Sequence, residues 1–376
     1  MELSRPDITA EDIAAVTAVL ESGWIVGGPQ QEIIETELST YCGYAFGIAV
    51  NSWTTGAFLV LHHLGIGPGD EVLVPSYSFI ATANVVKHVG ATPVFVDVEP
   101  GSWNVDAADL HRKVTARTRA VIAVDQLGMP LSASTLAAIA ELEVVCIRDS
   151  ACSIGSLLDG IPVGGGADFA VTSFHARKIL TSGEGGMIFT DDPEAANRLR
   201  RLKHQGMSLT DFERQSTTAV INESYPEVGY NFRLTDIQAA LLVSQFRRLS
   251  ETLARRTQVA AWYGKHLPNP RVNLPLVEFG VEPNWQSYQI QISEISNLEQ
   301  RDALLSNLKL RGIPAKRGVM AAHLEPAYSN IACGPLPVTE RAVITNITLP
   351  MHPNLTESDC AQVAQALHSA LEEVLP

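Results

Sequence analysis

The sequence predicts an α/β fold, with a large domain built on a mostly parallel central sheet and a smaller C-terminal α+β domain. Short apolar segments rich in β-branched residues alternate with amphipathic segments through the first two-thirds of the chain. That order is typical of parallel strands covered by helices on both faces. The composition then shifts, and 376 residues with 46% hydrophobic content suffice for two hydrophobic cores. We therefore expect a large domain over residues 1–245 and a small domain over residues 246–376.

The large domain is expected to contain six short buried strands. Amphipathic segments at 54–64 and 135–142 predict helices between them, and the Gly-Pro-Gly-Asp run at 67–70 predicts a turn. The predicted strands are residues 47–50, 71–74, 93–96, 120–124, 144–147 and 169–172.

A long helix is expected to begin near Thr235, because threonine is a good N-cap residue and a helical pattern follows it. We expect the small domain to begin within or just after this helix. Further along, residues 287–292 predict a strand, and residues 299–311 and 357–374 predict helices.

Composition restricts the classes of partner. A formal net charge of −14 argues against nucleic acids and anionic membranes, which both favour a basic surface. The first residues lack a basic segment followed by an apolar run, and no apolar stretch approaches the roughly 20 residues of a membrane span. The five cysteines are scattered and lack CxxC spacing, which predicts reduced thiols and no metal site. These features predict a cytoplasmic protein that acts on small molecules.

The most informative segment is 173–178, which ends in Lys178 and is followed by the Gly-Glu-Gly-Gly run at 183–186. A lysine amine that loses its proton in a desolvated pocket forms Schiff bases with carbonyl compounds, pyridoxal phosphate among them. Most lysines are solvated surface charges. The hydroxyl of Ser173 and the glycine-rich turn on either side favour a functional lysine here.

Asp149 directly follows a predicted strand, and ligands of open α/β sheets bind at the carboxyl ends of strands. A carboxylate there can hold the pyridine nitrogen of a cofactor in its protonated form. Such a charge-assisted hydrogen bond contributes about 1.5–3 kcal/mol. The alternative is that Asp149 caps the turn at 150–153, and the local sequence supports both interpretations equally.

Residues 51–56 follow another predicted strand and open a helix, whose N-terminus can bind a phosphate. Simple N-capping by Ser52 or Thr54 is the commoner use of such residues. Ser173 also follows a predicted strand, which favours the phosphate interpretation. Phe79 can stack on a planar ring, although an aromatic residue after a strand more often belongs to the core.

Together these segments resemble the DegT/DnrJ/EryC1/StrS family of PLP-dependent sugar aminotransferases. The resemblance runs in order through nearly the whole chain. The segments that carry it are 22–29, 67–72 with 75–79, 173–178 with 183–186, 229–233 and 349–353.

The resemblance implies an aspartate-aminotransferase-like fold of PLP type I and a homodimer with composite active sites. By the same resemblance, Lys178 forms the Schiff base with pyridoxal 5'-phosphate, Asp149 holds the pyridine nitrogen and Phe79 packs on the ring. The residue beside the phenolic oxygen of the cofactor is often Gln or His in the family. Here it is Cys152, a weaker hydrogen-bond partner.

The phosphate of the cofactor is implied to bind Ser173 and the Trp53-Thr54 turn, where a bulky tryptophan replaces the usual Gly or Ala. Asn231 is implied to reach the phosphate of the partner subunit's cofactor. Arg233 and His323 are candidates for contacts with the donor or the substrate.

The expected reaction is a ping-pong transfer of an amino group from an amino acid, by resemblance L-glutamate, to a nucleotide-linked keto-sugar. A keto-cyclitol acceptor is equally compatible with the sequence. A sugar dehydratase on the same scaffold carries His in place of the lysine, which Lys178 argues against. A non-catalytic binding protein has no need of both Lys178 and Asp149.

Overall fold

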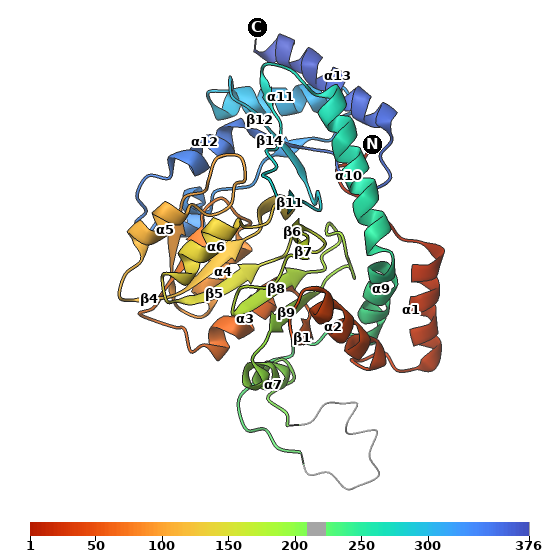
Figure 1. Cartoon of the computed structure of the whole chain (residues 1–376), viewed down its shortest axis with the longest axis vertical. Coiled ribbons are helices and arrows are strands. Elements are labelled where there is room, and N and C mark those ends of the chain that lie inside the picture. Colours follow the sequence, from red (N-terminus) through yellow and green to blue (C-terminus); the bar gives the residue numbers. More distant parts are fainter. Residues whose placement is uncertain (209–222, 376) are drawn as a thin grey trace.

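The computed structural model describes residues 1–208 and 223–375. A seven-stranded sheet with helices on both faces forms the large domain, and a four-stranded sheet with helices forms the small domain (Figure 1). The large sheet has the order β1-β9-β8-β5-β4-β2-β3. Its strands are β1 (Phe46–Val50), β2 (Glu71–Pro75), β3 (Thr92–Val96), β4 (Thr118–Val124), β5 (Val145–Asp149), β8 (Phe169–Ser173) and β9 (Gly186–Thr190).

All six strands predicted in the large domain are confirmed, and they run parallel to one another. The exception in the sheet is β9, which pairs antiparallel with both β1 and β8. Strand β9 was not predicted from the sequence, because its five residues follow a glycine-rich turn that is typical of a loop.

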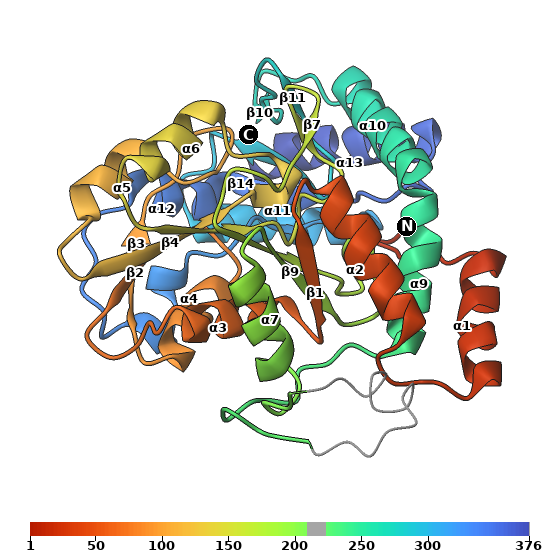
Figure 2. The ribbon, with the colours of Figure 1, turned by 60° about the horizontal axis from the view of Figure 1, so that its bottom comes forward.

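Helices cover the two faces of the large sheet as the alternating side chains of its strands require (Figure 2). In β4, Ala120 and Ile122 join the core under α3 (Trp53–His63), α4 (Ala81–His88) and α7 (Pro193–Leu202). Val121 and Ala123 face the opposite side, with α5 (Ala107–Lys113) and α6 (Ala133–Ala140). On that side α2 (Pro29–Tyr41) and α9 (Asp236–Arg247) pack over β1, β8 and β9, and α1 (Ala10–Ser22) packs on α9.

The small domain has its own core between its sheet and three helices. Its sheet has the order β10-β12-β14-β13, with β10 (Val272–Asn273), β12 (Tyr288–Ile292), β13 (Lys316–Arg317) and β14 (Asn346–Leu349). The expected strand is β12, and the expected helices are α11 (Leu298–Leu310) and α13 (Glu357–Val374). The small domain also contains the helices α10 (Leu249–His266) and α12 (Pro337–Thr345). Its strand β11 (Val281–Glu282) pairs with β6 (Leu157–Leu158) of the large domain, and β6 pairs with β7 (Ile161–Pro162), so the three strands form a small sheet.

The helix expected near Thr235 begins as predicted, because the Thr235 hydroxyl accepts from the Gln238 N–H in a capping box. The prediction of one long helix is wrong in detail. Arg248 leaves the helical region, with φ −111° and ψ 18°, so α9 ends there and α10 follows at an angle. We retain residues 1–245 and 246–376 as the proposed division, since the core of the small domain begins at Val259.

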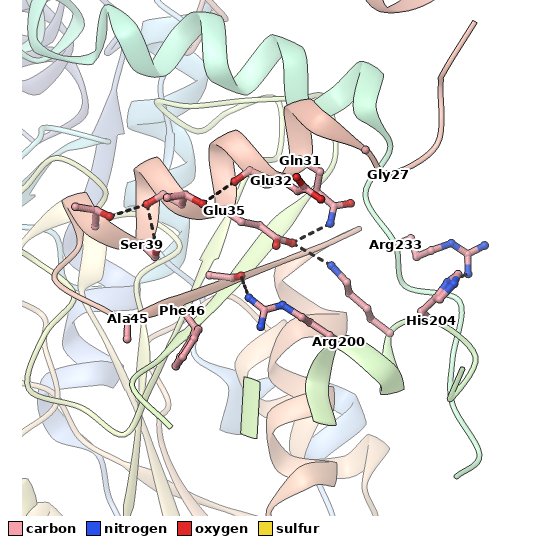
Figure 3. Close-up of a pocket in the computed structure, with 15 residues that line it drawn as sticks. Gly27, Gln31, Glu32, Glu35, Ser39, Ala45, Phe46, Arg200, His204 and Arg233 are labelled. Atoms are coloured by element: carbon pink, nitrogen blue, oxygen red, sulfur yellow. Dashed lines mark hydrogen bonds and ion pairs between the residues drawn. The ribbon is translucent and has the colours of Figure 1, made fainter. Parts of the chain in front are cut away.

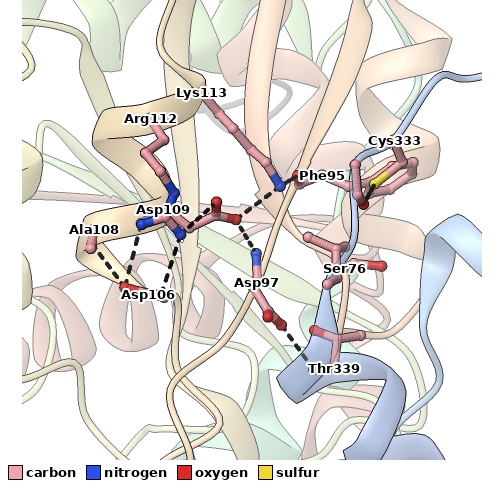
Figure 4. Close-up of polar contacts among 12 residues, drawn as sticks. Ser76, Phe95, Asp97, Asp106, Ala108, Asp109, Arg112, Lys113, Cys333 and Thr339 are labelled. Atoms are coloured by element: carbon pink, nitrogen blue, oxygen red, sulfur yellow. Dashed lines mark hydrogen bonds and ion pairs between the residues drawn. The ribbon is translucent and has the colours of Figure 1, made fainter.

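Polar contacts join the two domains at the end of β3 (Figure 4). The Asp97 carboxylate accepts the first N–H groups of α12, from Thr339 at 2.8 Å and from Val338 at 3.1 Å. The backbone N–H of Asp97 in turn donates to Asp109, which also pairs with Lys113. No helix among the described residues combines the length and the hydrophobicity that crossing a membrane requires.

A buried ion pair ties the ends of β4 and β5 together. The Arg148 guanidinium donates from Nε to Asp125 Oδ2 and from Nη2 to Asp125 Oδ1, at 2.9 Å each. Both side chains are excluded from solvent, with exposures of 2% and 0%. Ser153 and the Leu131 N–H also donate to Asp125, so its carboxylate is fully hydrogen-bonded.

Replacement of Arg148 by alanine is expected to lower the free energy of unfolding by about 3–5 kcal/mol, because it leaves the Asp125 charge buried and unpaired. Denaturant unfolding of the two proteins measures the difference. Arg112→Ala is the control, since its ion pair with Asp109 is 64% exposed on the arginine side and such pairs contribute about 1 kcal/mol or less. Equal losses in both variants would contradict the structural role of the buried pair.

Candidate active site

Three of the predicted site segments meet at one edge of the large sheet. Because β1, β5 and β8 run in the same direction, their carboxyl ends lie together. Ser52 follows β1, Asp149 ends β5 and Ser173 ends β8. A helix N-terminus, a carboxylate and a hydroxyl therefore lie together at this edge, although they come from three separate parts of the sequence between residues 52 and 173.

Lys178 lies at this edge on a turn that leaves β8. The turn is held by hydrogen bonds from the Phe174 N–H to the Gly185 carbonyl, at 2.8 Å, and from the Ala176 N–H to the Gly183 carbonyl, at 3.0 Å. Lys178 Nζ lies 3.0 Å from Cys152 Sγ, in the loop that follows Asp149. The structure thus brings the predicted lysine to the predicted cysteine.

Asp149 is buried at the same edge, with 5% of its surface exposed. Thr82 Oγ1 donates to its Oδ2 at 3.3 Å, and the Ala151 N–H donates to its Oδ1 at 3.1 Å. The second contact shows that Asp149 does cap the following turn, while its other oxygen remains turned toward α4. Burial raises the pKa of this carboxyl from 3.8 to about 7, against the opposing effects of the Ala151 N–H and the positive charge of Lys178.

The N-terminus of α3 adjoins β9. Ser52 is its N-cap and accepts the Thr55 N–H at 3.1 Å, so the capping interpretation is confirmed. The N–H groups of Trp53 and Thr54 belong to the first turn, where a helix provides no internal acceptor. A Cβ on Gly186 would lie 2.7 Å from the Trp53 nitrogen, so only glycine lets β9 approach this helix end so closely.

Phe79 is 59% exposed, whereas its neighbour Tyr77 is fully buried against Trp103. The core aromatic residue after β2 is therefore Tyr77, and the ring of Phe79 is left free to contact a ligand. The Phe79 carbonyl accepts the Thr82 N–H at 3.1 Å, which places Phe79 on the turn that leads to the Asp149 contact.

Asn231 and Arg233 lie in a different place from Lys178 within the single chain. Arg233 Nη1 is 2.9 Å from His204 Nδ1, and both line a cavity of about 460 Å³ together with Glu35 and Arg200 (Figure 3). The residues that line this cavity include none of Asp149, Cys152, Ser173 and Lys178. Asn231 is exposed beside it and forms an antiparallel bridge with His204.

His323 is packed into the joint between the domains. Its Nδ1 lies 2.6 Å from Ser76 Oγ, just beyond β2, and its Nε2 lies 3.6 Å from Glu340. Burial lowers the pKa of its imidazole. These contacts favour a role in holding the end of β2, and a contact between His323 and the substrate stays a prediction.

Three residues around the site were not predicted from the sequence. Thr82 contacts Asp149, and the amides of Asn284 and Gln286 line the space beside Lys178 and Cys152. The last two come from the small domain, and nothing in their local sequence sets them apart from the polar residues of an ordinary loop.

Comparison with known proteins now decides the family. The model of the DegT/DnrJ/EryC1/StrS aminotransferase family matches residues 6–368. The chain belongs to this family. It is therefore an aminotransferase, with pyridoxal phosphate as its cofactor.

Solved structures agree with the family over the full length of the chain. Spr1654 of Streptococcus pneumoniae, described as a sugar aminotransferase, is 29% identical in its PMP form, with a TM-score of 0.94 and 100% of both chains covered. The aminotransferase TlmJ from Streptoalloteichus hindustanus is 32% identical, with a TM-score of 0.91 and 100% of both chains covered. Helicobacter pylori PseC, an aminotransferase involved in the biosynthesis of pseudoaminic acid, is 27% identical, with a TM-score of 0.91 and 99% of each chain covered. The predicted aspartate-aminotransferase-like fold is confirmed.

The residues at the edge of the sheet fit pyridoxal phosphate. Within the described residues, the buried carboxyl of Asp149 has no cationic partner in direct contact, and a protonated ring nitrogen would supply one. Among the same residues, the buried Trp53 indole Nε1 has no hydrogen-bond partner, and Trp53 belongs to the first turn of α3, where an anion can bind. Pyridoxal phosphate bound at this edge would provide the missing partner of Asp149.

Asp149→Asn is expected to change how stability depends on pH in the cofactor-free protein. Because the folded pKa is raised from 3.8 to about 7, the folded state carries no penalty below pH 4 and loses stability as the pH rises toward 7. The asparagine variant lacks this loss. The difference in unfolding free energy between the variant and the wild type should therefore increase in favour of the variant from pH 4 to pH 7 and stay constant above pH 7. Denaturant unfolding at several pH values measures the difference, and parallel curves would show that Asp149 does not carry the shift.

Proposed function

We propose that the protein transfers an amino group from L-glutamate to a keto-sugar, in nucleotide-linked form, by a ping-pong mechanism. The observation that carries the proposal is the 3.0 Å contact between Lys178 and Cys152 at the edge of the sheet where Asp149 lies. The descriptions of Spr1654 as a sugar aminotransferase and of PseC in pseudoaminic acid biosynthesis support a sugar acceptor.

Bound pyridoxal phosphate supplies an electron sink that stabilises negative charge at the carbon bearing the amino group. Asp149 keeps the ring nitrogen protonated, which strengthens this withdrawal of electrons. The first N–H groups of α3 and the hydroxyl of Ser173 would hold the phosphate, and Phe79 would cover the ring. Together these residues would fix the orientation of the bound cofactor.

Lys178 binds the cofactor at rest and carries the proton during the reaction. With pyridoxal phosphate bound as the electron sink, the Lys178 amine would be the group that accepts the proton from the donor Cα and later gives a proton back. The Cys152 thiol, 3.0 Å from Nζ, would hold this amine at the edge of the sheet where Asp149 lies. The keto acid leaves before the acceptor binds, and the same amine moves the proton in the reverse direction onto the sugar.

We also propose a homodimer in which Asn231 reaches the phosphate of the partner's cofactor. Asn231 is exposed and lies beside a cavity that excludes Lys178 of its own chain, so its amide is free to complete a second copy's site. Arg233, which lines the same cavity, would contact the donor or the substrate.

Addition of L-glutamate to the purified enzyme is expected to remove the visible absorption band of the lysine-bound cofactor and replace it with a band in the near ultraviolet. Lys178→Ala should lack the lysine-bound band and turn over about 10²- to 10⁴-fold more slowly, because it loses the proton carrier. Lys309→Ala, which alters an exposed lysine of α11, is the control and should behave as wild type.

If glutamate leaves the visible band unchanged but another amino acid removes it, the protein is an aminotransferase with a different donor. If no amino acid changes the band, a non-catalytic binding protein is favoured. Once the cofactor carries the amino group, keto-sugar nucleotides and keto-cyclitols are compared as acceptors, and restoration of the visible band identifies the acceptor class.

Mixing two inactive variants tests the composite site. Lys178→Ala and Asn231→Asp are each expected to be inactive as homodimers, the second because a carboxylate repels the cofactor phosphate. After subunit exchange, each hybrid dimer contains one site with both lesions and one with neither, so activity should return to about a quarter of the wild-type value. Activity that stays at the level of the unmixed variants after subunit exchange would mean that one chain supplies both residues to its own site, which would contradict the proposal.

A further inference from the structure

The segment Asn284–Gln286, which leads into β12, reaches from the small domain to the loops that carry Cys152 and Lys178. Both amides are buried, with exposures of 3% for Asn284 and 8% for Gln286. Both line the narrow space beside Lys178 Nζ. Buried amides are costly unless their hydrogen bonds are made, so their partners define their role.

Asn284 holds the loop that follows Asp149. Its Nδ2 donates to the carbonyls of Cys152 and Ile154, at 2.8 Å each, and its backbone N–H donates to Ser156 Oγ at 3.1 Å. A Cβ on Gly128 would lie 2.0 Å from Asn284 Oδ1, so the Asn284 amide fits in this position only because residue 128 is glycine. The position of Cys152 is thereby tied to the small domain.

Gln286 holds the turn that carries Lys178. Its Nε2 donates to the Arg177 carbonyl at 2.6 Å, and its backbone N–H donates to Asn284 Oδ1 at 2.9 Å. The two residues are therefore linked to each other, through the Gln286 backbone N–H, as well as to the two loops. The segment Asn284–Gln286 therefore contacts both the loop that carries Cys152 and the turn that carries Lys178.

The segment is kept in a costly conformation. Trp285, between the two amides, has φ of 54°, a region that a bulky residue rarely adopts. The buried Arg256 donates to the carbonyls of Trp285 and Gln286, at 3.0 Å each, and burial lowers the pKa of its guanidinium to about 10. Backbone strain of this kind persists where the surroundings fix it, and it clusters at functional sites.

We propose that Asn284 and Gln286 are positioning residues of the amino-transfer reaction. Through the carbonyls of Cys152 and Arg177 they set the distance between the Cys152 thiol and the Lys178 amine. This inference rests on the proposed function, which assigns the proton transfer to Lys178. A displacement of the amine by about 1 Å is enough to cost about 10²-fold in rate.

The test uses the full-length variants Asn284→Asp, Asn284→Ala and Gln286→Ala. Asn104→Ala is the control, since Asn104 is also buried and bridges the Met129 and Pro130 carbonyls without touching the Cys152 or Lys178 loops. The first measurement is the rate at which pyridoxal phosphate added to cofactor-free enzyme forms the visible lysine-bound band. The second is the affinity for pyridoxamine phosphate, which binds without reacting with Lys178.

In the three variants of Asn284 and Gln286 the band should form about 10- to 100-fold more slowly, and kcat should fall by a similar factor. Pyridoxamine phosphate affinity and the KM for the donor should stay within about threefold of wild type, and the control should change neither rate. Band formation at the wild-type rate in all three variants would overturn the inference, as would equal slowing in Asn104→Ala. A wild-type enzyme that forms no lysine-bound band would instead refute the proposed function itself.

Discussion

The buried pair between Arg148 and Asp125 is the interaction on which the site depends. Side chains alternate across a strand, so Arg148 points to one face of β5 and Asp149 to the other. Arg148 pairs with the carboxylate at the end of β4, and Ser153 donates to the same carboxylate. The pair thus holds the end of β5 and the loop behind it, and it neutralises a charge that would otherwise add to the repulsion felt by Asp149.

With β5 fixed, the remaining groups are placed by backbone contacts more than by side-chain ion pairs. Gly186 allows β9 to lie against the first turn of α3, which brings the phosphate end of the proposed site next to the Lys178 turn. The small domain approaches from the other side with Asn284 and Gln286. The proposed catalytic lysine therefore lies where three segments distant in sequence meet, and a shift of any of them would move its amine.

The single chain separates the candidate residues into two groups. Asp149, Cys152, Ser173 and Lys178 lie at the carboxyl edge of the sheet, whereas Asn231 and Arg233 lie at the cavity bordered by α2 and α7. A chain that presents half of a site on one surface and the other half elsewhere is suited to symmetric pairing, in which each copy completes the other. The proposed dimer follows from this separation, together with the exposure of Asn231.

Much of the fold and part of the site were determined by local sequence. Alternating apolar and amphipathic segments predicted six parallel strands, and Thr235 predicted the start of α9, because burial patterns and capping act over a few residues. The motif around Lys178, together with the other matching segments along the chain, indicated the family and its chemistry. Only the tertiary structure decided the antiparallel β9, the break at Arg248, the burial of His323 against Ser76 and the contacts of Asn284. Each of these depends on partners distant in sequence, and a side chain gives no local sign of the carbonyl it will meet 130 residues away.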